Sequence, residues 1–68
     1  GLRSQVEADV TRVRIQIVYS GTNFGCYAEV RHGTTVLHET ILRPASMPHV
    51  ARRDAETWAT EHGHEVRS

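Results

Sequence analysis

The chain has few of the residues that most directly indicate a chemistry. Its single cysteine, Cys26, allows no intrachain disulfide and no cysteine-based zinc site. All eight basic residues are arginine, so the absence of lysine excludes Schiff-base chemistry and a lysine-containing phosphate loop. No apolar run approaches the roughly 18 residues that a membrane-spanning helix needs. We therefore expect a cytoplasmic domain without a membrane partner, since the residues given also open on no leader-like stretch.

Length and charge limit the possible class of protein and the number of domains further. The chain has 68 residues, with eight acidic residues against eight arginines, so its formal net charge is zero with histidine neutral. This balance excludes a strongly basic module that binds nucleic acid through overall charge, and it also excludes a strongly acidic tail or mimic protein. We expect one domain over residues 10–66, preceded by a flexible segment at 1–9. A domain this small buries only about 60% of its unfolded surface, so its stability is marginal.

Apolar and polar residues alternate over two stretches, which predicts strands at residues 10–19 and 24–32. Turn formers separate the two strands at residues 20–23. The residues expected to face inward are Val13, Ile15, Ile17 and Tyr19 on the first strand and Phe24, Cys26, Ala28 and Val30 on the second. The opposite face then carries Arg12, Arg14, Gln16 and Val18 on the first strand and Gly25, Tyr27, Glu29 and Arg31 on the second.

A His32-Gly33 turn leads to a third strand over residues 35–42, rich in β-branched side chains. Two orientations of this strand are possible. One buries the carboxylate of Glu39, whereas the other buries the imidazole of His38, which costs less free energy. We favour the second, which turns Val36, His38, Thr40 and Leu42 inward and leaves Leu37 and Ile41 outside.

A helix is predicted over residues 47–62, with Ser46 as N-cap, Pro48 in the first turn and Gly63 just past the end. Its inward stripe comprises Met47, Ala51, Ala55, Trp58 and His62, with Arg52 and Arg53 on the opposite side. Trp58 is expected to pack against Val13, Ile15 or Ile17; the alternative is a ligand-stacking role. The predicted fold is therefore α+β, a three-stranded antiparallel sheet with one C-terminal helix on one face. Residues 64–66 form a possible short fourth strand.

The sequence offers no catalytic constellation. Ser46, His49 and Asp54 lie on one predicted helix segment and do not converge as a triad. The five histidines lack the spacings of metal sites. We expect no enzyme activity, no metal, no cofactor and no small-molecule substrate.

The open face of the sheet is the remaining candidate site. Three arginines and an aromatic side chain on a pleated surface can enter a DNA major groove, where arginine reads guanine. The alternative is a solvated face on which Glu29 pairs with Arg12 or Arg14. The candidate nucleic-acid-binding residues are Arg12, Arg14, Gln16, Tyr27 and Arg31.

The order of three strands, a His-Gly turn and a helix carrying Ala55-x-x-Trp58 resembles the AP2-like DNA-binding domains at the N-termini of tyrosine recombinases. The resemblance covers about residues 10–63 and implies that the sheet face reads DNA through Arg12, Arg14, Tyr27 and Arg31. The topology is also similar to the β-β-β-α-β half-folds of HicB-type antitoxins and of many small bacterial proteins.

A protein partner is the second hypothesis. With Leu37 and Ile41 outside, an apolar patch on the open face is expected to serve as an interface, and its candidate residues are Val18, Tyr27, Leu37 and Ile41. Strand three, or strand one if it lies at the sheet edge, is expected to pair with a second copy to give a homodimer.

Overall fold

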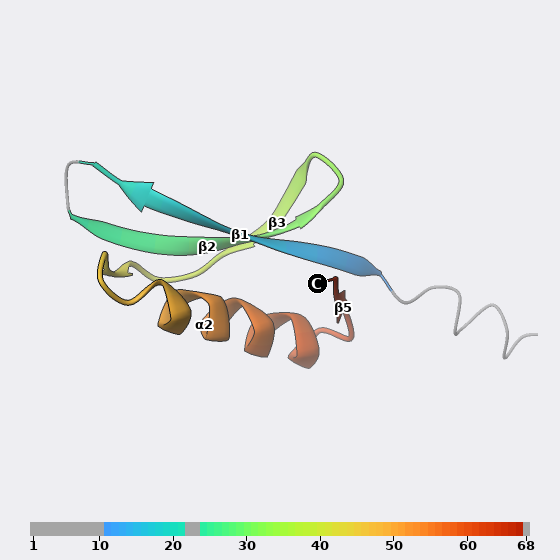
Figure 1. Cartoon of the computed structure of the whole chain (residues 1–68). Helices are drawn as coiled ribbons and strands as arrows, with labels where there is room; N and C mark the ends of the chain where they lie inside the picture. The colour runs from blue at the N-terminus through green and yellow to red at the C-terminus, as the bar shows by residue number, and fades with distance from the viewer. Residues whose placement is uncertain (1–10, 22–23, 68) are drawn as a thin grey trace, which may run out of the picture.

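The computed structural model describes residues 11–21 and 24–67. The expected flexible segment at 1–9 lies outside these residues. Within them the fold is α+β, with a mixed, mostly antiparallel sheet of five strands and one helix packed against it (Figure 1). The elements are β1 (Arg12–Ser20), β2 (Gly25–His32), β3 (Thr35–Glu39), β4 (Arg43–Pro44), α2 (Pro48–Glu61) and β5 (Glu65–Val66).

The strands are arranged in the order β3-β2-β1-β5, with the two-residue strand β4 also paired to β2. The long β1–β2 pair is antiparallel and runs from Arg14 opposite Arg31 to Ser20 opposite Gly25. The short β5 is parallel to β1 and matches it only at Arg12 and Val13. The expected three-stranded sheet with a short fourth strand is therefore confirmed, and β4 is an addition.

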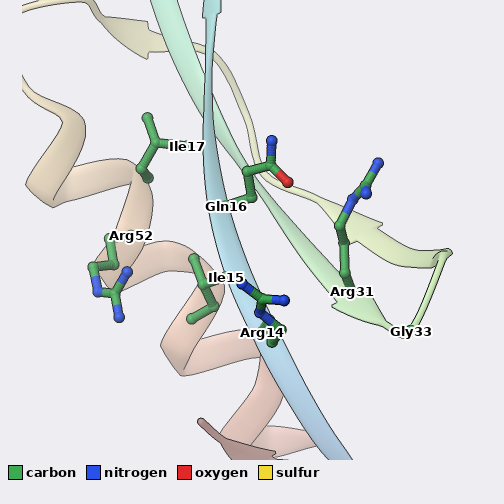
Figure 2. A pocket seen from close by; sticks show the side chains of 7 residues that line it. All are labelled: Arg14, Ile15, Gln16, Ile17, Arg31, Gly33 and Arg52. Atoms are coloured by element: carbon green, nitrogen blue, oxygen red, sulfur yellow. The ribbon is translucent and has the colours of Figure 1, made fainter. Parts of the chain in front are cut away.

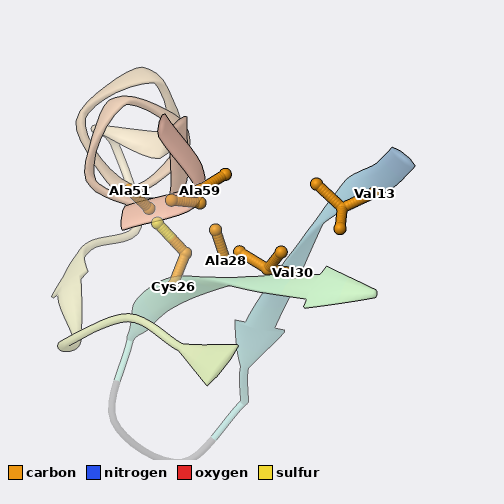
Figure 3. Close-up of a cluster of buried hydrophobic side chains, with 7 residues drawn as sticks. Val13, Cys26, Ala28, Val30, Ala51 and Ala59 are labelled. Atoms are coloured by element: carbon orange, nitrogen blue, oxygen red, sulfur yellow. The ribbon is translucent and has the colours of Figure 1, made fainter. Parts of the chain in front are cut away.

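The core lies between α2 and one face of the sheet, as the alternation predicts (Figure 3). Four residues expected to face inward are instead exposed: Phe24 (83%), Tyr19 (61%), Leu42 (49%) and Met47 (45%). The residues with no exposed surface are Val13, Cys26, Ala28, Val30, Ala51, Ala55 and Ala59. The three alanines recur every four residues along α2, so they form one stripe that lets the helix approach the sheet closely. The thiol of Cys26 belongs to this core and donates a hydrogen bond to the carbonyl of Pro44 at 3.3 Å.

The two ends of α2 differ in how they are capped. Met47, rather than the expected Ser46, is the N-cap residue, and no side chain caps this end. Pro48 occupies the first turn as expected, where its missing N–H removes one of the donors that need a cap. At the other end, Gly63 (φ 74°) donates to the Thr60 carbonyl and His64 to that of Ala59. This pair of bonds is a Schellman motif, so the expected role of Gly63 is confirmed.

The third strand is shorter than expected and irregular. Its pairing with β2 shifts between Val30 and Arg31, where His38 lies opposite Val30 and Val36 opposite Arg31. The intervening Leu37 is thus the extra residue of a β-bulge. His38 shares the helix-side face of Val30, as favoured from the sequence. Val36 lies on the same face as Arg31, away from the helix. The expectation that Val36 faces inward together with His38 is therefore wrong.

Beyond β3, Thr40 continues the sheet with its side chain instead of its carbonyl group. Its hydroxyl accepts the N–H of buried Ala28 at 2.9 Å, and its own N–H donates to the Ala28 carbonyl at 2.9 Å. The hydroxyl therefore satisfies a donor that a regular strand would satisfy with backbone. The chain can therefore leave the sheet at residues 40–42 without leaving the N–H of Ala28 in β2 unpaired.

The strand β4 is tied to the helix by one bidentate ion pair. The Arg43 guanidinium donates to the two carboxylate oxygens of Asp54 from Nε at 2.8 Å and from a terminal nitrogen at 3.2 Å. This hydrogen bonding raises the pKa of Arg43. The pair fixes the connection between sheet and helix on the β2 side of the molecule.

Candidate functional site at the edge of strand β1

The register of the first two strands brings most of the candidate nucleic-acid-binding residues to one face. Arg14 lies opposite Arg31, and Val18 lies opposite Tyr27. Gln16 lies between these pairs, opposite Glu29. Because directly paired residues point to the same side of a sheet, this face is the one away from α2. Arg12 lies beside β5 and forms an exposed ion pair with Glu65 at 3.6 Å.

Carboxylates offset the arginines over the centre of this face. Glu29 is only 8% exposed and accepts a hydrogen bond from Arg31 Nε at 3.1 Å. Glu39 lies directly opposite Glu29 on β3. Glu29 thus pairs with Arg31 rather than with Arg12 or Arg14. The middle of the open face is therefore unsuited to a polyanion. Tyr27, on β2, lies farther from β5 than the β1 arginines do.

Positive charge instead gathers where β1 forms the edge of the sheet. Two hollows there share Arg14, Ile15 and Arg52 in their walls. Figure 2 shows the larger one, with Ile15, Ile17 and Arg52 on the side of α2 and Gln16 and Arg31 beyond the strand. Arg52 is half-buried, so its expected place on the back of the helix, away from the sheet arginines, is wrong.

The smaller hollow contains a third arginine that the sequence did not indicate. The chain beyond β5 continues alongside β1, and the N–H of Arg67 donates to the Val13 carbonyl at 2.8 Å. Arg67 thereby joins Arg14 and Arg52 around Ile15. We call these three residues, Arg14, Arg52 and Arg67, the arginine cluster. The only sequence feature that points to this position of Arg67 is the possible strand at 64–66, because a strand there determines where the next residue lies.

The arginine cluster carries more positive charge than its neighbours neutralise. Arg52 contacts Glu56 at 3.5 Å, four residues along the helix. Within residues 11–21 and 24–67, Arg14 and Arg67 form no ion pair. Guanidinium groups that line one hollow give it a positive potential, which favours an anion there. The planar donors of arginine also match phosphate oxygens.

The four candidate interface residues do not form one patch. Val18 and Tyr27 lie side by side on the open face and are half-buried. Leu37 occupies the bulge of β3 and is 37% exposed. Ile41 is 65% exposed but lies beyond β3, where it lines a groove beside α2 together with His38 and Trp58.

Trp58 is stacked by the chain's own imidazoles. His38 lies parallel to the indole with ring centroids 4.5 Å apart, and His62 stacks at 4.1 Å. His64 adds a third ring at 5.5 Å. Trp58 is half-buried against the core rather than its central anchor. With these rings on the indole, the chain itself occupies the surface that a stacking ligand would need.

Nowhere in residues 11–21 and 24–67 do three or more His, Cys, Asp or Glu side chains gather as metal ligands. In the same residues, the one helix is too short and polar to cross a membrane.

Comparison with known proteins leaves the geometry as the guide to function. No protein-family model matches this chain, and no significant match to it is found among curated proteins or solved structures.

Proposed function

We propose that this chain is a non-enzymatic domain that binds the phosphate backbone of duplex DNA through the arginine cluster at the β1 edge. The observation that carries this proposal is the convergence of Arg14 of β1, Arg52 of α2 and Arg67 just after β5 on one hollow. Their carboxylate neighbours are too few to neutralise them within the described chain.

The surroundings of the cluster favour an extended polyanion over a small ion. The hollows are open to solvent and follow β1, and the larger one continues past Gln16 to Arg31. A backbone lying along this edge meets guanidinium groups in succession, whereas an enclosed anion site would surround a single group. Of the sheet face that the AP2-like resemblance implies for DNA contact, only the part with Arg14, Gln16 and Arg31 belongs to the larger hollow.

Because the net charge is zero, the affinity for DNA in this proposal comes from the arginine cluster and not from the overall charge of the domain. Contact with about three phosphates gives a log–log salt slope of about −3. Titrating fluorescently labelled duplex at about 50 mM salt, and repeating the titration at rising salt, tests this directly. Saturable binding with that shallow slope supports the proposal, and no signal change at high micromolar protein overturns it.

A further inference from the structure

The outer edge of β1 is open over most of its length. Within residues 11–21 and 24–67, β5 pairs with β1 only at Arg12 and Val13, so Ile15–Ser20 has a strand partner on the β2 side alone. An unpaired edge presents a row of N–H and C=O groups to any strand that can align with it.

This edge lacks the features that usually prevent strand addition. Residues 15–20 read Ile-Gln-Ile-Val-Tyr-Ser, without a charge, a proline or a glycine. The opposite edge of the sheet is different, because β3 has five residues, contains the bulge at Leu37 and ends on Glu39. Of the two open strand edges, the part of β1 beyond its pairing with β5 is thus the one suited to accept a partner strand.

We propose that this edge pairs antiparallel with β1 of a second copy of the chain, with Ile17 facing Ile17 across a two-fold axis. Each copy has one such edge, so the contact closes as a dimer. Val18 of each copy then lies opposite Gln16 of the other, and Tyr19 opposite Ile15.

The apolar pattern selects this register. Ile15 and Ile17 are half-buried and Tyr19 is 61% exposed, all on the helix-side face of the sheet. Pairing about Ile17 brings these side chains from both copies together on one face, where they extend the core. A one-residue slip would instead set each of them against the polar face of the other copy.

Charge and space agree with the same register. The paired segment runs from Ile15 to Tyr19 of each copy and stops short of the edge beside Val13, where β5 and the N–H of Arg67 already bond β1. Like charges do not face each other along the paired strands. The two Arg14 residues are separated by six positions along the strands, or about 20 Å. Strand pairing covers Ile15, Gln16 and Ile17, which line the larger hollow, so in the dimer the phosphate contacts fall to Arg14, Arg52 and Arg67 around the smaller one.

Two variants with substitutions at the same positions test both the partner and the register. The double variant Gln16→Lys/Val18→Glu sets opposite charges across both Gln16–Val18 contacts, and Gln16→Lys/Val18→Lys sets like charges there. Sedimentation equilibrium at tens of micromolar, with circular dichroism to confirm folding, is expected to show a dimer of two 7.7 kDa chains for the wild type. The Lys/Glu variant is expected to remain dimeric, and the Lys/Lys variant to be monomeric.

Two results overturn the proposal. A wild-type chain that sediments only at 7.7 kDa at these concentrations shows that β1 does not pair with a second copy. The partner strand would then have to come from a different protein. Equal dimerisation of the two double variants shows that the copies do not meet in this register. Neither result bears on DNA binding through Arg14, Arg52 and Arg67, because these residues lie outside the paired segment and that binding is measured separately.

Discussion

Arg52 of α2 and Arg14 of β1 line the same two hollows, although they lie on different elements and far apart in the sequence. The helix brings Arg52 there because Ala51 and Ala55, which precede and follow it in the sequence, are fully buried against the sheet. With the alanine stripe seated on the sheet, the neighbouring side chain of Arg52 emerges beside β1. Small residues in the core thus place a charged one at the edge.

Removal of the Thr40 hydroxyl should destabilise the domain without altering its shape. Thr40→Val keeps the volume but leaves the N–H of buried Ala28 without its acceptor, so we expect a loss of about 1–3 kcal/mol in the free energy of unfolding. Thr40→Ser keeps the oxygen and should lose about 1 kcal/mol or less. Urea denaturation followed by circular dichroism gives both values. Equal losses in the two variants would show that the hydroxyl does not satisfy Ala28.

A methyl group at residue 25 should disturb the packing of the chain that follows β3. A Cβ built on Gly25 would lie 2.8 Å from Leu42 Cγ and 3.0 Å from the Arg43 carbonyl oxygen. Leu42 can move, but the backbone oxygen is held by β4, so we expect Gly25→Ala to cost about 1–3 kcal/mol of stability.

Gly21→Ala is the matched control for this substitution, since no atom lies within 4 Å of the Cβ it would add. Thermal unfolding of the two variants should show a lower midpoint for Gly25→Ala alone. If Gly21→Ala lowers the midpoint as much, loss of glycine itself rather than the close approach of Leu42 and Arg43 explains the effect.

Access of a solvent quencher to Trp58 should depend on the rings stacked on it. His38 lies parallel to the indole with ring centroids 4.5 Å apart, and His62 stacks at 4.1 Å. Because His38 covers the indole ring, we expect His38→Ala to let acrylamide quench the emission of the single tryptophan more strongly than in the wild type.

His49→Ala, at the exposed start of α2, is the matched control for this substitution. Its quenching by acrylamide should equal that of the wild type, and circular dichroism checks that both variants stay folded. Equal quenching in the wild type and His38→Ala would contradict the stacked arrangement.

Periodicity alone predicts the faces of β1 and β2, because a two-residue repeat of apolar side chains leaves one way to bury them. It also predicts α2 and its end at Gly63. It does not predict the bulge at Leu37, since side chains of mixed polarity there favour neither orientation strongly. The use of the Thr40 hydroxyl in place of a carbonyl depends on tertiary contacts with Ala28 and leaves no mark in the pattern.

The candidate site was less predictable than the fold. Alternation correctly groups Arg14 with Arg31, but it carries no information about how a helix sits across a sheet. A helical projection therefore assigns Arg52 to the back of α2, whereas close packing through Ala51 and Ala55 turns it toward β1. Arg67 joins the cluster through the parallel pairing of β5, a contact between distant segments that the sequence pattern only suggested.

Two neighbouring arginines of α2 provide the most direct test of DNA binding at the β1 edge. Arg52 lines both hollows, whereas Arg53 is exposed and lines neither. In a titration of labelled duplex by fluorescence anisotropy, we expect Arg52→Ala to weaken binding roughly tenfold and to reduce the salt slope by about 1. Arg53→Ala removes the same charge from the same helix and should bind as the wild type does. Equal losses in the two variants, or no loss in either, would contradict the account.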